Sequence, residues 1–258
     1  MVKFINPIII TIISIGIVFI CTLIGTSFIF FIKKKDKMTN GLFFGLAGGI
    51  MIASGIFGLL VPGMEDAKDN FKNISVIFVT ISFLLGGLLI YLIDKIVIAF
   101  NKNSPNLSTN IKLVTAIAIH NVPEGLAVGF ACGLALIKKD PESIMSALTF
   151  AIGIAIQNIP EGSVVSIPLY ESGVSKFKAF IAGIISGIIE PIFALIGIML
   201  VTSSKNLLSL FLVFASGSMI YVTIDELLPR IKEGKNEYYG LFAFMIGFVI
   251  MLILELIL

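Results

Sequence analysis

The chain is a succession of long apolar stretches separated by short polar segments. A helix needs about 20 apolar residues to cross a hydrocarbon core of about 30 Å, and eight stretches reach or approach that length. Lipid offers no hydrogen bonds to open backbone groups, so the sequence predicts helices here rather than strands. The predicted spans are Phe4–Ile32, Gly41–Gly63, Ser75–Ile98, Leu113–Ile137, Ser143–Tyr170, Ala179–Thr202, Leu207–Leu228 and Tyr238–Leu258.

Composition supports the same interpretation. The chain is 57% hydrophobic and 13% charged, whereas soluble domains are about 45–50% apolar and about 25% charged. We therefore predict an all-α membrane protein, with residues 1–258 forming one transmembrane domain of eight helices in a multi-pass protein of the cell (inner or plasma) membrane. The net charge of +2 gives no indication of a nucleic-acid partner. Cys21 and Cys132 both fall in apolar runs and are expected to be buried thiols without a disulfide.

Lys and Arg are unevenly shared between the two sides of the predicted bundle. The loops after the first, third, fifth and seventh spans carry twelve of them, and the opposite side carries six. Loops rich in Lys and Arg remain in the cytoplasm, so both termini are predicted to be extracytoplasmic.

Acidic residues also occur inside the apolar spans. Glu124, Glu161 and Glu190 have no Lys or Arg in their own spans, and an acid at the bilayer centre costs about 2.5–3.5 kcal/mol on insertion scales. Protons or a bound cation must neutralise them, and protonated carboxyls hydrogen-bonded within the bundle are the alternative to a metal. Glu255 is expected to be solvated at the outer interface, and Asp94, beside Lys95, either marks the cytoplasmic interface or has a function.

A hexapeptide is repeated in two consecutive spans. The fourth span contains His120 to Gly125, HNVPEG, and the fifth contains Gln157 to Gly162, QNIPEG. At 3.6 residues per turn, positions i, i+1 and i+4 lie within about 100° of arc. Each repeat therefore presents one polar face, and the two faces comprise His120, Asn121, Glu124, Gln157, Asn158 and Glu161.

Proline gives each repeat a second property. Pro123 and Pro160 cannot donate to the carbonyls of Ile119 and Ile156, and each ring is expected to kink its helix. Interrupted helices that face one another are typical of transporter binding sites near the bilayer midplane. We therefore expect the kinked fourth and fifth helices at the centre of the bundle.

The donor set of the two repeats suits a borderline divalent metal such as zinc, iron or manganese. It combines one imidazole, carboxamides, two carboxylates and free carbonyls, and two neighbouring carboxylates could bridge two ions. A lone His in a helix is more often a core residue than a ligand. His120, however, is the single His of the chain and lies four residues before an intramembrane Glu, which favours a ligand.

These segments resemble the ZIP (Zrt/Irt-like) family of metal transporters, in its prokaryotic branch. HNVPEG is similar to the hallmark of that family, and QNIPEG to its second motif. SGIIEP at 186–191 resembles its third acidic motif, and GSMIYVTIDELLP at 217–229 its seventh-helix segment. GLAGGIMIAS at 45–54 and LLIYLIDK at 88–95 fit its second and third helices.

The resemblance implies eight helices, both termini outside, a homodimer and a binuclear metal centre. One ion would be held by His120, Glu124, Gln157 and Glu161. The second would be held by Asn121, Glu124, Asn158, Glu161 and Glu190, with Glu124 and Glu161 bridging. Asp94 and Asp225 would line the metal route.

Two departures from the family pattern modify these expectations. Gln157 stands where many relatives have His, so strict zinc selectivity is not expected. The loop between the third and fourth spans has no His, so a His-rich metal sensor is absent from it.

The predicted function is transport of divalent transition metals (zinc, and also iron, manganese or cadmium) into the cytoplasm. The metal is the substrate, no organic cofactor is expected, and the protein is not predicted to be an enzyme. An intramembrane zinc hydrolase is the first alternative, although HExxH is missing. A passive cation channel is the second, because the same acidic lining would serve it. The glycines spaced by four in spans two, four and six indicate close helix packing, or sliding between groups of helices.

Overall fold

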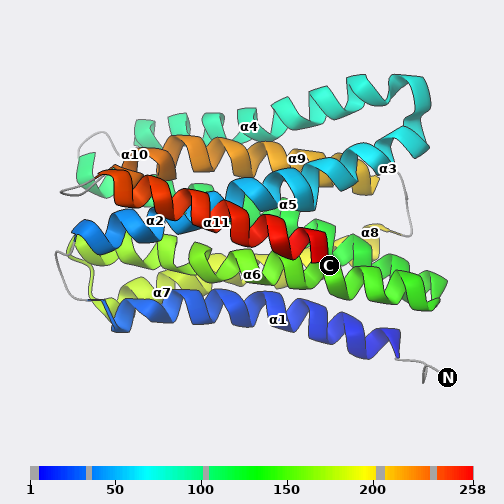
Figure 1. Cartoon of the computed structure of the whole chain (residues 1–258), viewed down its shortest axis with the longest axis horizontal. Helices are drawn as coiled ribbons and strands as arrows, with labels where there is room; N and C mark the ends of the chain where they lie inside the picture. Colours follow the sequence, from blue (N-terminus) through cyan, green and yellow to red (C-terminus); the bar gives the residue numbers. More distant parts are fainter. Residues whose placement is uncertain (1–5, 33–36, 101–104, 202–206, 233–236, 258) are drawn as a thin grey trace.

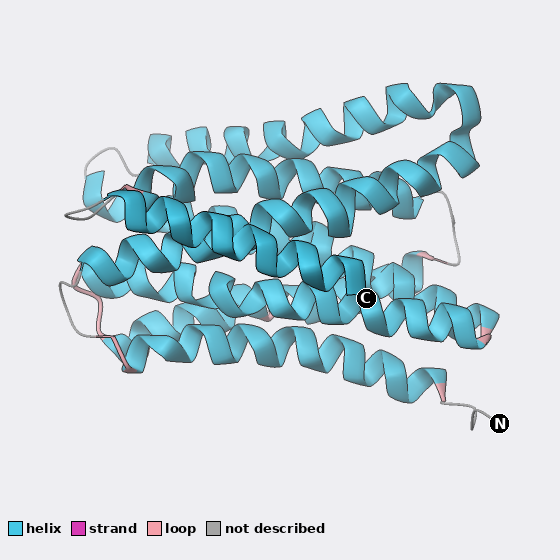
Figure 2. Cartoon of the chain, viewed as in Figure 1, coloured by secondary structure: helices cyan, strands magenta, loops and turns pink. Residues whose placement is uncertain are grey.

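The protein is an elongated bundle of helices that run side by side (Figures 1 and 2). The computed structural model describes residues 6–32, 37–100, 105–201, 207–232 and 237–257, and every regular element in these ranges is helical. Seven helical stretches within them are long and apolar enough to cross a membrane. The predicted all-α membrane fold agrees with this bundle.

One of the seven stretches contains two of the predicted spans. It runs from Gly41 to Ile96, and its 56 residues are more than twice the number that a single crossing needs. It comprises α2 (Lys37–Ala53), the π-helix η2 (Ser54–Leu60), α3 (Val61–Phe71), the 3-10 helix η3 (Lys72–Ile74) and α4 (Ser75–Phe100). The chain reverses direction between α3 and α4, where Lys72 has φ of 51° (Figure 1).

The other elements follow the predicted spans, with one difference. The sixth span is two helices, α7 (Lys176–Gly187) and α8 (Ile189–Leu200), because Pro191 has no N–H for the carbonyl of Gly187. The rest are α1 (Pro7–Ser27), η1 (Phe28–Phe30), α5 (Pro105–Lys138), α6 (Pro141–Glu171), α9 (Leu207–Val222), the π-helix η4 (Thr223–Leu227), α10 (Leu228–Ile231) and α11 (Glu237–Ile257).

The helices associate in four long pairs: α1 lies along α6, α8 along α5, α2 along α11 and α4 along α9. Glycines at these crossings allow backbones to touch. A Cβ atom on Gly125 would lie 2.5 Å from the carbonyl oxygen of Glu190, and one on Gly162 would lie 2.5 Å from that of Thr22. The close packing indicated by the glycine spacing is therefore confirmed, and the last residue of each hexapeptide occupies such a crossing.

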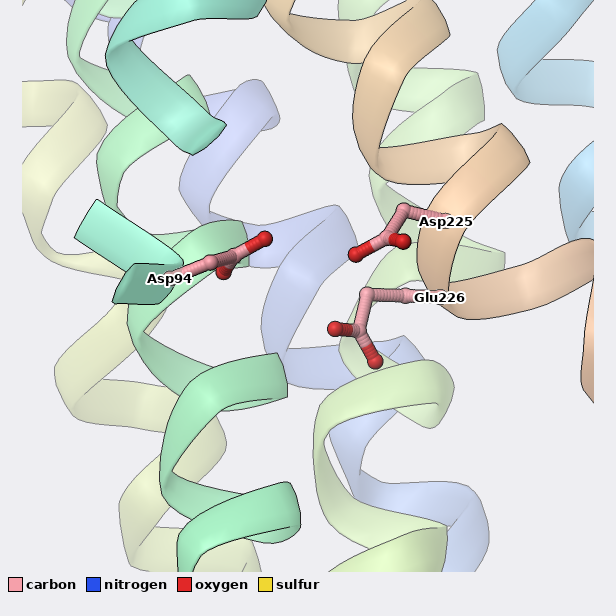
Figure 3. A group of neighbouring side chains, drawn as sticks. All are labelled: Asp94, Asp225 and Glu226. Atoms are coloured by element: carbon pink, nitrogen blue, oxygen red, sulfur yellow. The ribbon is translucent and has the colours of Figure 1, made fainter. Parts of the chain in front are cut away.

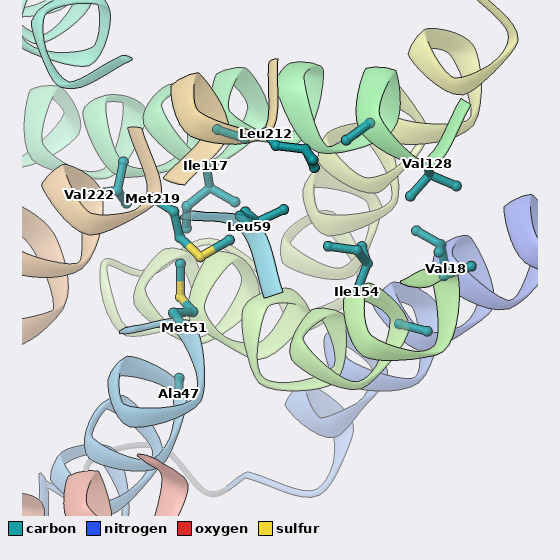
Figure 4. Close-up of a cluster of buried hydrophobic side chains, with 14 of the residues drawn as sticks. Val18, Ala47, Met51, Leu59, Ile117, Val128, Ile154, Leu212, Met219 and Val222 are labelled. Carbon is teal, nitrogen blue, oxygen red and sulfur yellow. The ribbon is translucent and has the colours of Figure 1, made fainter. Parts of the chain in front are cut away.

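The buried apolar core lies between α1, α2, α5, α6 and α9 (Figure 4). Met51 of α2 and Met219 of α9 point toward each other within it, and Ile154 of α6 lies further along (Figure 4). The outer faces of α4 and α11 are also apolar but exposed, as at Leu84 and Phe242. Cys132 is buried, as predicted, whereas Cys21 is only partly buried, and both are free thiols. The bundle is therefore apolar on its outer faces as well as in its core, as a lipid environment requires.

Candidate metal centre

The two hexapeptides lie in the two longest helices, α5 and α6, which are joined by only Lys139 and Asp140. Helical structure continues through both repeats, with Pro123 inside α5 and Pro160 inside α6. The polar residues of the repeats point inward, since the side chains of Asn121, Glu124, Gln157, Asn158 and Glu161 are all at most 1% exposed. The helical spacing therefore brings the predicted polar faces to the interior.

Two short hydrogen bonds join the repeats to each other and to α8. Gln157 Nε2 donates to Glu124 Oε1 at 2.7 Å, which ties α6 to α5. Asn158 Nδ2 donates to Glu190 Oε2 at 2.6 Å, which ties α6 to α8. Bonds from an amide to a carboxylate at these distances are short for an N–H donor. Three helices therefore converge on one polar cluster.

The backbone contributes acceptors to the same cluster. Asn121 Nδ2 donates to the carbonyl oxygen of Ser186 at 3.3 Å, just before the break between α7 and α8. Asn158 Nδ2 also lies 3.4 Å from the carbonyl oxygen of Val18 in α1. Each asparagine thus fixes its own helix against a neighbour and keeps its side-chain oxygen available.

Three carboxylates meet in this interior. Glu190 shares a side-chain hydrogen bond with Glu124 and interacts electrostatically with both Glu124 and Glu161. All three are at most 1% exposed, and the buried charged residues of the described chain are all acidic. Buried like charges at close range require a proton or a cation between them.

The oxygens of the cluster point to a cation. Several oxygens of this cluster are buried and accept no hydrogen bond from the described residues, among them Asn121 Oδ1, Gln157 Oε1, Asn158 Oδ1 and Glu190 Oε1. A buried polar atom without a partner is costly, and amide and carboxylate oxygens can act only as acceptors or metal ligands when the carboxylate is ionised. A divalent cation would satisfy several of them at once.

His120 belongs to α5, but its side chain lies outside the described residues. The backbone places His120 and Glu124 one turn apart on the same face of the helix. The predicted imidazole ligand therefore stays a prediction.

A second acidic group lies elsewhere in the bundle. Asp94 of α4 points toward Asp225 and Glu226 of η4, and one ligand atom from each lies within 4.8 Å of the others (Figure 3). Asp94 and Glu226 are buried, whereas Asp225 is exposed. The family resemblance assigned Asp94 and Asp225 to one metal route, and the structure brings them together.

Glu226 was missed as a site residue. The available signal was that it directly follows Asp225 within an apolar span, but a regular α-helix directs neighbouring side chains about 100° apart. The π-helix η4 changes that geometry locally, and π-helices are frequent at functional sites.

Glu255 is less exposed than predicted. It was expected to be solvated, yet the side chain is half-buried and its Oε1 would lie 2.6 Å from a Cβ atom on Gly58 of η2. The long apolar contact between α11 and α2 carries the carboxylate back over η2, which a hydropathy pattern does not reveal.

Comparison with known proteins relates this arrangement to a family. The family model described as ZIP zinc transporter matches residues 106–255, which include both hexapeptides, Glu190 and the two acids of η4. The zinc transporter ZupT of Stenotrophomonas maltophilia is 33% identical over 254 residues, with 91% of each chain covered. The chain belongs to the ZIP family.

Other ZIP relatives show how the similarity is distributed. ZupT of Streptococcus mutans is 32% identical and covers 88% of this chain. Human zinc transporter ZIP11 is 43% identical over 143 residues, which are 55% of this chain but only 42% of the human protein. The chain therefore spans less than half of ZIP11, whereas it matches the bacterial ZIP proteins along most of their length. ZIP proteins are transporters and not enzymes, as the sequence predicted for this chain.

Proposed function

We propose that this protein transports divalent transition-metal ions, zinc among them, across the membrane into the cytoplasm. One observation carries the proposal: Glu124, Glu161 and Glu190 converge from α5, α6 and α8 with the amides of both hexapeptides. An exchangeable ion is the substrate that such a buried acidic set can neutralise. The similarity to proteins named as zinc transporters supports zinc as one of these substrates.

The proposed centre holds two ions. The first would be bound by the His120 imidazole with Glu124, Gln157 and Glu161. The second would be bound by Asn121, Asn158 and Glu190, again with Glu124 and Glu161. The two shared glutamates would bridge the ions, and the uncoordinated amide oxygens of Asn121, Gln157 and Asn158 supply neutral ligands.

The acids of α4 and η4 belong to the cytoplasmic part of the proposed metal route. Asp94, Asp225 and Glu226 lie near the end of the bundle to which the positive-inside distribution assigns the cytoplasm. We assign them to the metal route, where an ion leaving the centre would next meet carboxylates.

The proposed topology has eight crossings in one domain over residues 1–258, with both termini extracytoplasmic and the protein in the cell membrane. The reversal between α3 and α4 supports eight crossings, since it divides the longest apolar stretch. Kinks at Pro123 and Pro160, and a homodimer, complete the proposal.

The ligand atoms of the proposed centre favour transport of a broad range of divalent metals. Carboxylates and amides bind zinc, iron(II), manganese and cadmium, whereas further imidazole nitrogens would favour zinc. Only one imidazole is available, because the chain has a single His.

The test is metal uptake by purified protein in liposomes, with zinc, iron(II), manganese, cadmium and cobalt as competing substrates. We expect saturable zinc uptake that Glu124→Ala and Glu161→Ala abolish. Glu142→Ala is the matched control, because Glu142 is an exposed acid near the start of α6. Wild-type rates in both glutamate variants would overturn the proposal.

Assays on the same purified protein distinguish transport from the two alternatives, a passive channel and an intramembrane hydrolase. Saturable flux with slow turnover excludes an open channel, and hydrolysis of generic lipids or peptides would indicate an enzyme. The comparisons favour neither alternative, because the relatives are named as zinc transporters.

A further inference from the structure

A cavity of about 430 Å³ lies between η2, α6 and the C-terminal part of α11. None of the residues assigned to the metal centre lines it. Its polar lining consists of Ser54 from η2, Ser146 and Thr149 from α6, and Glu255 from α11. Glu255 is the charged residue among the described side chains of this lining, so the cavity combines one carboxylate with neutral hydroxyls.

Ser54 and Glu255 face each other across a glycine. A Cβ atom on Gly58 would lie 2.6 Å from Glu255 Oε1 and 3.3 Å from Ser54 Oγ. Ser54 is 1% exposed, and within the described residues its Oγ has no hydrogen-bond partner. A buried hydroxyl beside a carboxylate, with no protein partner of its own, indicates a ligand in the cavity.

The architecture of the chain provides an independent reason to expect a ligand in this cavity. The first three passes (α1, α2 to α3, and α4) and the last three passes (α7 to α8, α9 to α10, and α11) repeat the same plan. The first pass of each set lies on one of the two central helices, α1 on α6 and α8 on α5. The second pass of each set lies on the third pass of the other set, α2 on α11 and α9 on α4. The second pass of each set contains a π-helix, η2 or η4, with Pro62 or Pro229 close behind it. Two π-helices at equivalent places mark equivalent regions of the two sets.

Each of these regions faces an acid on the third pass of the other set. Asp94 of α4 lies against η4, and Glu255 of α11 lies against η2. The C-terminal ends of α4 and α11 point to opposite ends of the bundle (Figure 1). The cavity beside Glu255 is therefore the counterpart, at the other end, of the acidic group of Asp94, Asp225 and Glu226.

We propose that this cavity is a loading site for a hydrated divalent cation, bound by the carboxylate of Glu255 with help from the hydroxyl of Ser54. The proposal rests on the proposed transport function and names the place where an ion waits before it enters the metal centre. Under the positive-inside assignment the cavity is at the extracytoplasmic end.

Size and charge agree with a hydrated ion. At about 30 Å³ per water, a cation with six waters needs roughly 200 Å³, which the cavity can hold. A single carboxylate binds such an ion weakly, whereas the three carboxylates of the centre bind a dehydrated ion more tightly. Ile154 forms part of the inner wall, and Gln157 of the metal centre lies one helical turn beyond it on α6.

The test uses the full chain in intact cells, with initial rates of zinc uptake measured against zinc concentration. We expect Glu255→Gln to raise KM roughly three- to tenfold and to leave the maximal rate within about twofold, because loss of a guiding charge slows capture more than later steps. The KM of the wild type should increase with ionic strength, and that of Glu255→Gln should not. Glu142→Gln, the same change at an exposed acid near this end, should behave as wild type.

Gly58→Ala is a second variant that keeps the charge. Its new methyl group must displace the flexible end of Glu255, so KM should rise while the elution profile of the purified protein stays unchanged. An unchanged KM in both variants would overturn the loading site. A lower maximal rate at constant KM would do so too, because it would assign Glu255 a structural role.

Equilibrium dialysis with zinc separates this proposal from the transport function. In purified Glu161→Gln protein, whose centre is weakened, we expect residual low-affinity zinc binding that the additional change Glu255→Gln lowers by one site per chain, while binding at Asp94, Asp225 and Glu226 remains. If the wild type transports no zinc but this residual binding depends on Glu255, the transport proposal fails and the site remains. Residual binding that is unaffected by Glu255→Gln overturns the site.

Discussion

The two hexapeptides have nearly the same sequence but meet different partners. In α5, Gly125 touches the backbone of α8 at Glu190, so this crossing adds a third carboxylate. In α6, Gly162 touches the backbone of α1 at Thr22, and the polar group that α1 offers to Asn158 is the carbonyl of Val18. The two hexapeptides therefore present equivalent helix surfaces. The helix packed against each surface determines whether a further carboxylate, that of Glu190, is added there.

The largest expected effect concerns the carboxylate that only one side possesses. We expect Glu190→Gln to lower zinc uptake per folded protein at least tenfold, the scale on which loss of groups around a metal site acts. Uptake rates in liposomes, normalised to the amount of monodisperse protein, measure this. Glu142→Gln serves as the control, and uptake at the wild-type rate in Glu190→Gln would mean that α8 and α1 are equivalent partners.

The next effect tests whether the two crossings are equally tight. Gly125→Ala and Gly162→Ala would each place a methyl group 2.5 Å from a backbone oxygen, so the helices must separate. Overpacking of this kind costs about 1–3 kcal/mol and should lower the melting temperature of both variants. Gly16→Ala is the matched control, because nothing lies within 4 Å of its Cβ position. A normal melting temperature in only one variant would show that the crossings differ in tightness.

A smaller effect concerns the first position of each repeat. Gln157→His would give α6 the imidazole that α5 already carries, while removing the amide donor to Glu124. Because imidazole favours zinc over manganese, we expect the preference for zinc to increase roughly tenfold in competition uptake. An unchanged preference would show that the asymmetry between His120 and Gln157 does not set the metal range.

The smallest effect concerns the start of α6. Asp140 accepts hydrogen bonds from the backbone nitrogen and the hydroxyl of Ser143, both at 2.9 Å, and these bonds lower the pKa of its carboxyl. The stabilisation is complete above the ordinary Asp value of 3.8 and is lost as pH falls through the lowered value. Asp140→Ala should therefore melt slightly earlier than wild type at pH 7, and this difference should shrink in acid. Asp140→Ser, which preserves a cap, is the control.

The sequence predicted the parts of this protein that depend on local periodicity. Apolar length located the helices, and the i, i+1, i+4 spacing placed Glu124 and Gln157 on facing surfaces, where the structure joins them at 2.7 Å. Glu190 was identified as an acid inside an apolar span, and the resemblance assigned it to the second ion, which spacing within the repeats could not do. The metal itself and the imidazole of His120 stay predictions.

The features that the sequence did not predict arise from long-range packing or from irregular helices. The π-helices η2 and η4 depend on how α2 and α9 fit against their neighbours, so Glu226 was not assigned to the group of Asp94. Glu255 was placed in solvent because a hydropathy pattern contains no information about α11 lying over η2. The break at Ile188 had a local signal in Pro191, but the length of the apolar stretch outweighed it.

The two-residue connection between α5 and α6 has a consequence for biosynthesis. An isolated helix that brings Glu124 or Glu161 into the bilayer faces an insertion cost of about 2.5–3.5 kcal/mol for each acid. Because only Lys139 and Asp140 separate the helices, α6 follows α5 directly out of the ribosome and can enter the membrane with it as a hairpin. The amide of Gln157 then meets Glu124 inside that hairpin, so one acid acquires a donor before the last three passes, and Glu190 with them, enter the membrane.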